Sequence, residues 1–266
     1  MIYEEYSPSA LAISIVSHGQ GALIRKLLQD LQPLAQQGAQ ILLTLNLPEE
    51  ESFVEGLTYG LTVIRNAMPK GFGDNHNSAC GCTSRPWFAV LNPDIRCSPS
   101  VFAALAAAHR EGRAGVTAPR VVSPDGQEED SVRRYPSVLR IAARVAGRLA
   151  GLRMSADYAL GDGRTRPVDW AAGMFLLFKT TEYRHIGGFD PRYFLYLEDA
   201  DICRRLHSIG RPALVVPSVS VVHDARRATG RSLRHLRWHL ASMVRFLFIT
   251  RWSRPPRPLA PPTPRL

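Results

Sequence analysis

Residues 11–45, LAISIVSHGQGALIRKLLQDLQPLAQQGAQILLTL, decide the fold class of this chain. The apolar run Leu11–Val16 has the length of a buried strand, and Ser17-His18-Gly19 ends it. The apolar residues that follow recur at helical spacing: Leu23, Ile24, Leu27, Leu28, Leu31 and Leu34. Gln40–Leu45 is a second apolar run of strand length. A strand, a helix and a strand in this order predict two parallel strands joined by a crossover helix.

The same alternation continues to about residue 110. We expect strands at Leu61–Ile64 and Trp87–Leu91, a helix from Asn75 to Cys80 capped by Asp74 or Asn75, and a helix over Ser100–His109. This pattern predicts an α/β fold with a mainly parallel sheet and helices on both faces. Ligands of such sheets bind beyond the carboxyl ends of the strands.

The second half of the chain is less regular. The expected strands are Trp170–Phe178, Ala213–Val216 and Val219–Val222, and the expected helices are Val138–Leu152, Thr181–Ile186, Asp199–Ile209 and Ser232–Ile249. No clean linker separates the halves, so we expect one domain over residues 1–250, divided at about 11–122 and 123–250. Residues 251–266 are rich in proline and arginine and are expected to be a disordered tail.

Composition is that of a folded protein, with 266 residues of which 45% are hydrophobic and 21% charged. No apolar run approaches the ~20 residues of a membrane-spanning helix. The acidic start MIYEEYSPSA does not resemble a signal peptide, so we expect a cytoplasmic protein. The four cysteines lack the spacing of a zinc site and are too few for a disulfide scaffold.

Charge is distributed unevenly along the chain. The net charge is +10, yet residues 1–224 balance, because residues 225–266 hold ten arginines and no acidic residue. Such a segment could meet lipid headgroups, nucleic acid or another anionic surface, or it could be a solvated tail. The helix expected at 232–249 has an apolar stripe that suits the surface of an anionic membrane, but the stripe could equally pack on the core.

Three polar clusters could support catalysis. Asn92-Pro93-Asp94 follows a buried strand and offers oxygen ligands for Mg²⁺ or Mn²⁺, although the tripeptide also suits a plain turn. Glu198, Asp199 and Asp201 follow the apolar Phe194–Leu197, so they either complement a helix dipole or supply a base. His223 ends an expected strand. No dinucleotide fingerprint, P-loop or nucleophile elbow is present.

The order of these features resembles the family-2 inverting glycosyltransferases, which have a nucleotide-sugar-binding fold of the GT-A type. The matching stretches are ISIVSH (13–18), GFGDNHN (71–77), LNPD (91–94), WAAGM (170–174), GGFD (187–190), FLYLEDADICRR (194–205) and VH (222–223). Within this family the chain looks most like the rhamnosyltransferases of bacterial surface polysaccharide assembly. The resemblance covers roughly residues 11–250.

The resemblance implies a role for each of these polar residues. Asp199 matches the catalytic base, Asp94 matches the last acid of the Asp-x-Asp metal motif, and His223 matches a late metal ligand. Asn92 stands at the first position of that motif, where an amide replaces an acid and removes one charge. A divalent cation, Mn²⁺ or Mg²⁺, is the implied cofactor. The implied donor-binding residues are Ser17, Asn46, Asn75, Asn77 and Asp94, and the implied acceptor-binding residues are Trp170, Gly173 and Glu198. Leu45-Asn46 stands where many members have Asp-Asn.

The implied activity is metal-dependent transfer with inversion. The donor would be a nucleoside diphosphate sugar, with dTDP-rhamnose as the expected case, and the acceptor a lipid-linked or cell-surface glycan. Residues 11–122 would bind the donor and residues 123–250 the acceptor. The expected protein is cytoplasmic and could lie on the inner face of the cytoplasmic membrane through residues 225–257. A catalytically silent scaffold that binds glycan or nucleotide sugar is the alternative, and a nucleic-acid-binding arm at the basic C-terminus is a weaker one.

Overall fold

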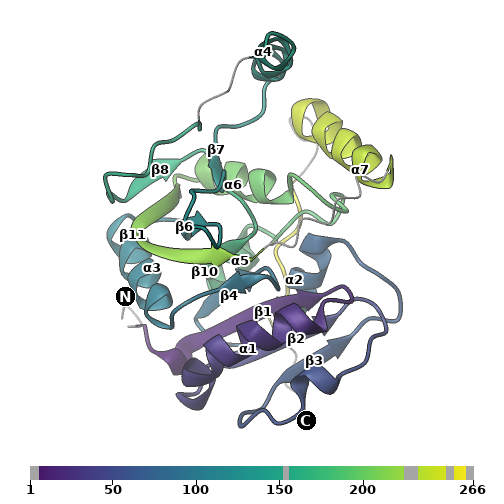
Figure 1. Ribbon diagram of the computed structural model, residues 1–266, viewed down its shortest axis with the longest axis vertical. Coiled ribbons are helices and arrows are strands. Elements are labelled where there is room, and N and C mark those ends of the chain that lie inside the picture. Colours follow the sequence, from purple (N-terminus) through teal and green to yellow (C-terminus); the bar gives the residue numbers. More distant parts are fainter. Residues whose placement is uncertain (1–5, 152–155, 225–232, 250–254, 262–266) are drawn as a thin grey trace.

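A twisted mixed sheet forms the centre of the computed structural model, which describes residues 6–151, 156–224, 233–249 and 255–261 (Figure 1). The strand order is β3-β2-β1-β4-β10-β6-β11-β5, with β8 also paired to β11. The strands of this sheet are β1 (Leu11–Ser17), β2 (Gln40–Leu45), β3 (Thr62–Arg65), β4 (Trp87–Leu91), β5 (Ile95–Arg96), β6 (Val116–Val122), β8 (Arg166–Val168), β10 (Phe175–Lys179) and β11 (Ala213–His223). A small separate ribbon pairs β7 (Val132–Arg133) with β9 (Trp170–Ala171).

The first four strands confirm the parallel arrangement expected from residues 11–45. β1 pairs in parallel with β2 on one side and β4 on the other, so that Ile13 lies opposite Ile41 and Ala89. β3 adds to β2, also in parallel. The carboxyl ends of these strands therefore meet at one edge of the sheet, which is the edge where ligands bind in such folds.

The second half of the sheet is mixed rather than parallel. β10 runs antiparallel between β4 and β6, whereas β6 and β11 pair in parallel. β5 and β8 are antiparallel to β11. The expected strand Trp170–Phe178 is in fact two strands, because the chain turns at Ala172–Met174 and enters the main sheet only at Phe175. β9 belongs to the separate ribbon with β7, so the turn at 172–174 leads from that ribbon into the main sheet.

Helices cover both faces of the sheet, as expected. Their bounds are α1 (Gly21–Gln36), α2 (Phe72–Cys80), α3 (Ser100–Glu111), α4 (Val138–Leu149), α5 (Thr180–His185), α6 (Glu198–Ser208) and α7 (Leu233–Val244). α1 and α3 share one apolar core with the residues of β1 and β2 that point to that face. α2, α5 and α6 share a second core on the opposite face. The side chains of each strand thus alternate between two buried layers.

The start of α2 and the strands at 213–222 differ most from the sequence-based expectation. α2 begins at Phe72 with Gly71 as its N-cap, earlier than the cap expected at Asp74 or Asn75. A side chain on Gly71 would lie 2.5 Å from the carbonyl oxygen of Phe194, so only glycine allows the two segments to meet. The two short strands expected at 213–222 form the single strand β11, with an irregularity in register between Val216 and Ser220.

The C-terminal part is only partly described. α7 continues as a π-helical turn, Arg245–Ile249, so the two together cover the helix expected over Ser232–Ile249 except for Ser232, which lies outside the described residues. Residues 225–232 of the basic segment also lie outside the described residues. Residues 255–261, expected to be disordered, lie against the end of α5, where the Leu259 N–H donates to the Arg184 carbonyl at 2.9 Å. Leu259 packs on the second core, which gives this proline-rich segment an apolar anchor. The division into halves stays a prediction.

Candidate active site

Asp199 lies in the first turn of α6, at the carboxyl edge of the sheet. Its Oδ2 accepts the N–H of Gly173 at 2.9 Å, and its Oδ1 accepts the N–H of Ala200 at 2.8 Å. The Gly173 donor is available because residues 172–174 form the turn between β9 and β10 and not part of a ladder. Each carboxylate oxygen has a second lone pair, so the two backbone bonds fix the side chain without using its whole acceptor capacity.

The environment of Asp199 favours a proton acceptor. Burial raises the pKa of Asp199, while the N–H groups of Gly173 and Ala200 and the positive charge of Arg133 oppose this shift. Burial and the adjacent Asp199 charge raise the pKa of Glu198 well above its usual range. Glu198 is therefore the partner that takes the proton first, which leaves the charge on Asp199.

The residues before α6 have a strained backbone. Tyr196 and Leu197 both adopt left-handed conformations, with φ of 74° and 65°. Side chains other than glycine rarely adopt this region, and consecutive examples are typical of functional sites. The Phe194 carbonyl accepts the N–H of Phe72 at 3.0 Å, so the start of α2 holds this loop from one side.

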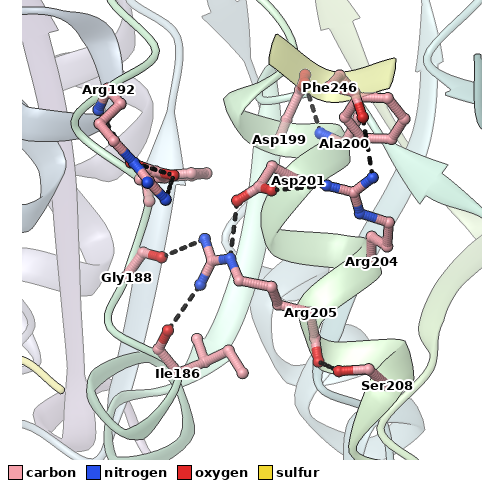
Figure 2. A network of polar contacts seen from close by, with 12 residues as sticks. Ile186, Gly188, Arg192, Asp199, Ala200, Asp201, Arg204, Arg205, Ser208 and Phe246 are labelled. Atoms are coloured by element: carbon pink, nitrogen blue, oxygen red, sulfur yellow. Dashed lines mark hydrogen bonds and ion pairs between the residues drawn. The ribbon is translucent and has the colours of Figure 1, made fainter. Parts of the chain in front are cut away.

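Asp201 has a structural environment. Its carboxylate contacts Arg204 at 3.2 Å and Arg205 at 2.7 Å (Figure 2). The Arg205 guanidinium also donates to the carbonyls of Ile186 and Gly188 at 2.6 and 2.7 Å, so it joins α6 to the GGFD segment. The Asp201 carboxylate points toward these two arginines. Of the neighbouring acids, only Asp199 contacts that turn among the described hydrogen bonds.

A second cluster joins Asp94 to the end of β11. His223 Nε2 lies 3.2 Å from Asp94 Oδ2, and His223 Nδ1 lies 2.7 Å from Glu129 Oε2. Burial lowers the pKa of His223, but the hydrogen bonds and charges of Asp94 and Glu129 outweigh it and raise the pKa to about 9. The N–H of Asp224 donates to the Asp94 carbonyl at 2.8 Å, which fixes the backbone of both segments together.

The donor set at this cluster fits a divalent cation. Asp94 Oδ1 is buried and has no hydrogen-bond partner among the described residues. A carboxylate oxygen and an imidazole suit Mn²⁺, and Mg²⁺ or Mn²⁺ commonly completes its coordination with water and substrate phosphate. Glu129 would be the outer partner that orients a ligating histidine. No group of three or more His, Cys, Asp or Glu side chains in the described part of the chain has the arrangement of a complete metal site.

Residues 173 and 174 connect the two clusters. Gly173 donates to Asp199, and the carbonyl of Met174 accepts the N–H of Asn92 at 2.9 Å. The predicted base and the predicted metal-binding tripeptide therefore lie on either side of one short turn. The Asn92 side chain is half-buried, and its role as a ligand stays a prediction.

A network of amide side chains lies beyond the ends of β2 and β3. Asn46 Oδ1 accepts from Asn66 Nδ2 and from the Lys70 N–H, both at 2.8 Å. Asn66 Nδ2 also donates to Asn75 Oδ1 at 2.6 Å, and Asn75 Nδ2 donates to the Gly71 carbonyl at 3.0 Å. The network fixes the segment that leads from β3 into α2. Two predicted donor-binding residues, Asn46 and Asn75, are thus brought together, with both of their amide ends used inside the protein.

The other predicted donor and acceptor residues are more dispersed. Ser17 is buried at the end of β1, where its Oγ accepts the Gln20 N–H at 3.2 Å. Asn77 binds Phe189 and Tyr183 and so holds the GGFD segment. Trp170 is buried and its indole N–H donates to the Arg134 carbonyl at 3.2 Å. The structure gives Asn77 and Trp170 packing contacts, so their contact with substrate stays a prediction. So does that of Glu198, which is 4% exposed.

Sequence reasoning did not identify Glu129, Arg133 or Asn66. Glu129 and Arg133 lie in or beside a polar connection that reads only as a turn. Asn66 follows the short strand β3, and its position after a strand, like that of Asn46, is the pattern that would have identified it.

Comparison with solved structures identifies the fold. Solved structures with the same fold include GalNAc-T7 with UDP, GalNAc and Mn²⁺ (TM-score 0.61, 16% identity, 83% of this chain and 44% of that chain). They also include the mannosyltransferase PcManGT from Pyrobaculum calidifontis with GDP-Man and Mn²⁺ (TM-score 0.61, 14% identity, 96% of this chain and 69% of that chain). The chain therefore has the GT-A-like fold of glycosyltransferases.

Comparison with sequence relatives shows which glycosyltransferases the chain resembles. The N-acetylglucosaminyl-diphospho-decaprenol L-rhamnosyltransferase of Mycobacterium tuberculosis is 35% identical over 201 residues, which cover 72% of this chain and 64% of that protein. This chain thus matches less than two thirds of that relative. The rhamnosyltransferase WbbL of Escherichia coli (strain K12) is 26% identical over 88% of this chain and 91% of that protein. No family model matches the chain. The chain is similar in sequence to these two rhamnosyltransferases, which confirms the resemblance seen in its motifs.

Proposed function

We propose that the chain is an inverting rhamnosyltransferase that uses Asp199 as its base. The arrangement of the carboxylate is the observation that supports this most directly. Asp199 is fixed by Gly173 at a helix start, one residue away from the backbone contact with the Asn92–Asp94 tripeptide. A base and a diphosphate-binding region on opposite sides of one turn are what a single displacement requires.

The reaction follows from the charge on Asp199. The carboxylate accepts the proton of an acceptor hydroxyl as that oxygen forms a bond to the anomeric carbon of the donor. The bond between that carbon and the diphosphate breaks in the same displacement, so the configuration inverts. A pKa raised by burial makes Asp199 a stronger base near neutral pH. The start of α6 keeps the carboxylate ionised through its N–H groups and its dipole.

Asp94 and His223 would hold a divalent cation, with Asn92 as a further oxygen ligand. When bound, such a cation supplies Lewis-acid stabilisation of the departing diphosphate. Because the His223 pKa is about 9, the imidazole must release its proton to become a ligand. Glu129 keeps the His223 ring oriented, because its Oε2 lies 2.7 Å from His223 Nδ1.

The relatives suggest the substrates. The M. tuberculosis relative is named for an acceptor with N-acetylglucosamine on a diphospho-decaprenol, so we assign a polyprenyl-diphosphate-linked sugar as acceptor. We assign dTDP-rhamnose as donor, bound at the ends of β1 and β2 near Ser17 and Asn46. A shallow pocket beside these ends is lined by residues that include Gly19, Arg25, Ser52 and Phe53, and it would take part of the nucleotide.

The location in the cell is also a proposal. Of the helices in the described ranges, none combines the length and apolar composition needed to cross a bilayer. We assign the protein to the cytoplasmic side of the membrane, where lipid-linked acceptors lie. Contact of residues 225–257 with an anionic membrane belongs to this proposal, and binding to nucleic acid does not.

The test is a screen of nucleotide sugars with the full-length protein. Thermal stabilisation is measured for each sugar with and without Mn²⁺, followed by transfer to a polyprenyl-diphosphate-N-acetylglucosamine analogue. We expect dTDP-rhamnose to stabilise the protein only with the cation and to be consumed. Stabilisation without hydrolysis or transfer would instead support the silent scaffold.

A further inference from the structure

Helix α7 contacts the loop that precedes the base. The ring centroids of Trp238 and Phe194 lie 4.7 Å apart, and Ser242 Oγ donates to the Leu195 carbonyl at 2.8 Å. The Tyr196 hydroxyl lies 2.9 Å from His235 Nδ1. The face of α7 that touches the protein thus includes His235, Trp238 and Ser242, together with Met243, which packs on the second core. It is directly connected to the strained residues before Asp199.

The opposite face of α7 is aliphatic and exposed. Leu233, Leu236, Leu240 and Val244 are 84%, 55%, 56% and 52% exposed. Their spacing places them on one side of the helix. A helix of a soluble domain normally buries this side and exposes its polar side. In α7 these four residues stay exposed, so the sequence-based alternative that the stripe packs on the core does not apply to them.

The charge around this stripe indicates what covers it. Arg237 is exposed next to the stripe, and Arg234 and Arg245 lie on the same helix and its continuation. Residues 225–266 contain no acidic residue. A second copy would therefore bring arginines against arginines if it docked through the same face. An anionic lipid surface would accept both the aliphatic stripe and the positive charge.

A second helix shows the same pattern. In α4, Val138, Leu139 and Leu149 are exposed, whereas Arg140 and Arg144 point to Asp157, with contacts of 3.5 and 2.9 Å. Figure 1 shows α4 and α7 at the same end of the molecule, far from β3. Two helices with exposed aliphatic residues at one end are typical of a surface that meets a bilayer.

We propose that the exposed stripe of α7, with α4 at the same end of the molecule, docks the protein on an anionic membrane and holds the base loop at the lipid surface. The benefit of docking rests on the proposed function, because only a lipid-linked acceptor presents its sugar at the membrane surface. The link is physical: α7 contacts both the lipid and the Phe194–Tyr196 loop. Lipid contact thereby places Asp199 within reach of the acceptor sugar.

The experiment compares full-length variants in vesicle co-sedimentation. The vesicles contain phosphatidylcholine alone or phosphatidylcholine with phosphatidylglycerol. The test variants are Leu236→Ser with Leu240→Ser, and Arg237→Gln. Ile209→Ser is the matched control, because Ile209 is also half-exposed (49%) but lies at the end of α6. Unfolding temperature and light scattering are measured for each variant.

We expect the wild type and Ile209→Ser to bind the anionic vesicles. The double leucine variant should bind at least ~10-fold more weakly, since each leucine contributes apolar burial. Arg237→Gln should bind more weakly in low salt only. Transfer to a water-soluble acceptor should be unchanged in the double variant. If the wild-type protein shows no such transfer, the proposed function is refuted, whereas the docking surface is not. Vesicle binding that is absent in the wild type or unaffected by the leucine changes would overturn the docking surface. So would a wild-type dimer that the leucine changes dissociate.

Discussion

Replacing Asp199 with asparagine removes the proposed base and keeps its shape. In the structure, one oxygen of Asp199 accepts from Gly173 and the other from Ala200. An asparagine has only one acceptor oxygen, so its NH₂ group must face one of these N–H donors. That donor loses its partner, which costs ~1–3 kcal/mol. Part of this cost is offset because a buried charge is removed as well.

The expected effect on transfer is much larger than the effect on stability. Loss of general-base catalysis lowers the rate by at least ~10²-fold, or about 2.7 kcal/mol in activation free energy. The unfolding temperature should fall by only a few degrees, at ~2–4 °C per kcal/mol for a chain of this size. Donor binding with Mn²⁺ should be nearly unchanged, because the assigned donor contacts belong to Asp94, His223 and the ends of β1 and β2.

The assay is initial-rate transfer to the lipid-linked acceptor analogue, with thermal unfolding in parallel. Glu198→Gln is the matched control: the raised pKa keeps Glu198 protonated, so glutamine replaces a neutral group of similar shape. Asp201→Asn should lower stability through its contacts with Arg204 and Arg205 and affect transfer less. Near-wild-type transfer by Asp199→Asn, together with loss in Glu198→Gln or Asp201→Asn, would refute the reasoning.

Three further predictions address the metal cluster and the support of α6. A His223 pKa raised from 6.5 to about 9 stabilises the metal-free protein by up to about 3 kcal/mol below pH 6.5, and this is lost as pH rises through 9. Urea unfolding across this range should show the loss, and Glu129→Gln should reduce it; a flat profile in the wild type contradicts the pairing. Chelation should abolish transfer, and Asp94→Ala should weaken Mn²⁺-dependent donor binding in calorimetry, whereas full transfer in excess chelator would remove the cation from the mechanism. Arg205→Ala should destabilise the protein by about 3 kcal/mol, because it leaves the buried Asp201 carboxylate with one fewer partner. An unchanged urea midpoint would contradict that structural role.

The sequence predicted the parts of the fold that depend on local pattern. The continuous apolar runs of β1, β2 and β4 identified buried parallel strands, and β2 and β4 have the bounds expected from them. The pattern could not show that β10 enters the sheet in the opposite direction. That direction depends on pairing with β4 and β6, which lie far away in the sequence, and the break at Ala172–Met174 sits inside an apolar stretch without a periodic signal.

The motifs allow candidate site residues to be named, but they do not reveal the tertiary partners of those residues. Asp199, Asp94 and His223 could be named because each belongs to a motif in family order. Glu129 could not, because its contact with His223 joins residues that are 94 positions apart. The exposed face of α7 is a related case: periodicity identifies the stripe, but only packing shows that the side opposite to it contacts the protein.

The central claim is that this chain transfers a sugar with inversion and that Asp199 is the base. The most direct measurement follows product formed by the wild-type protein and Asp199→Asn from dTDP-rhamnose, Mn²⁺ and a polyprenyl-diphosphate-N-acetylglucosamine analogue. The anomeric configuration of the product is read by NMR. We predict an inverted linkage with the wild type and at least ~10²-fold less product with the variant. A retained configuration, or equal product from the two proteins, would contradict the account.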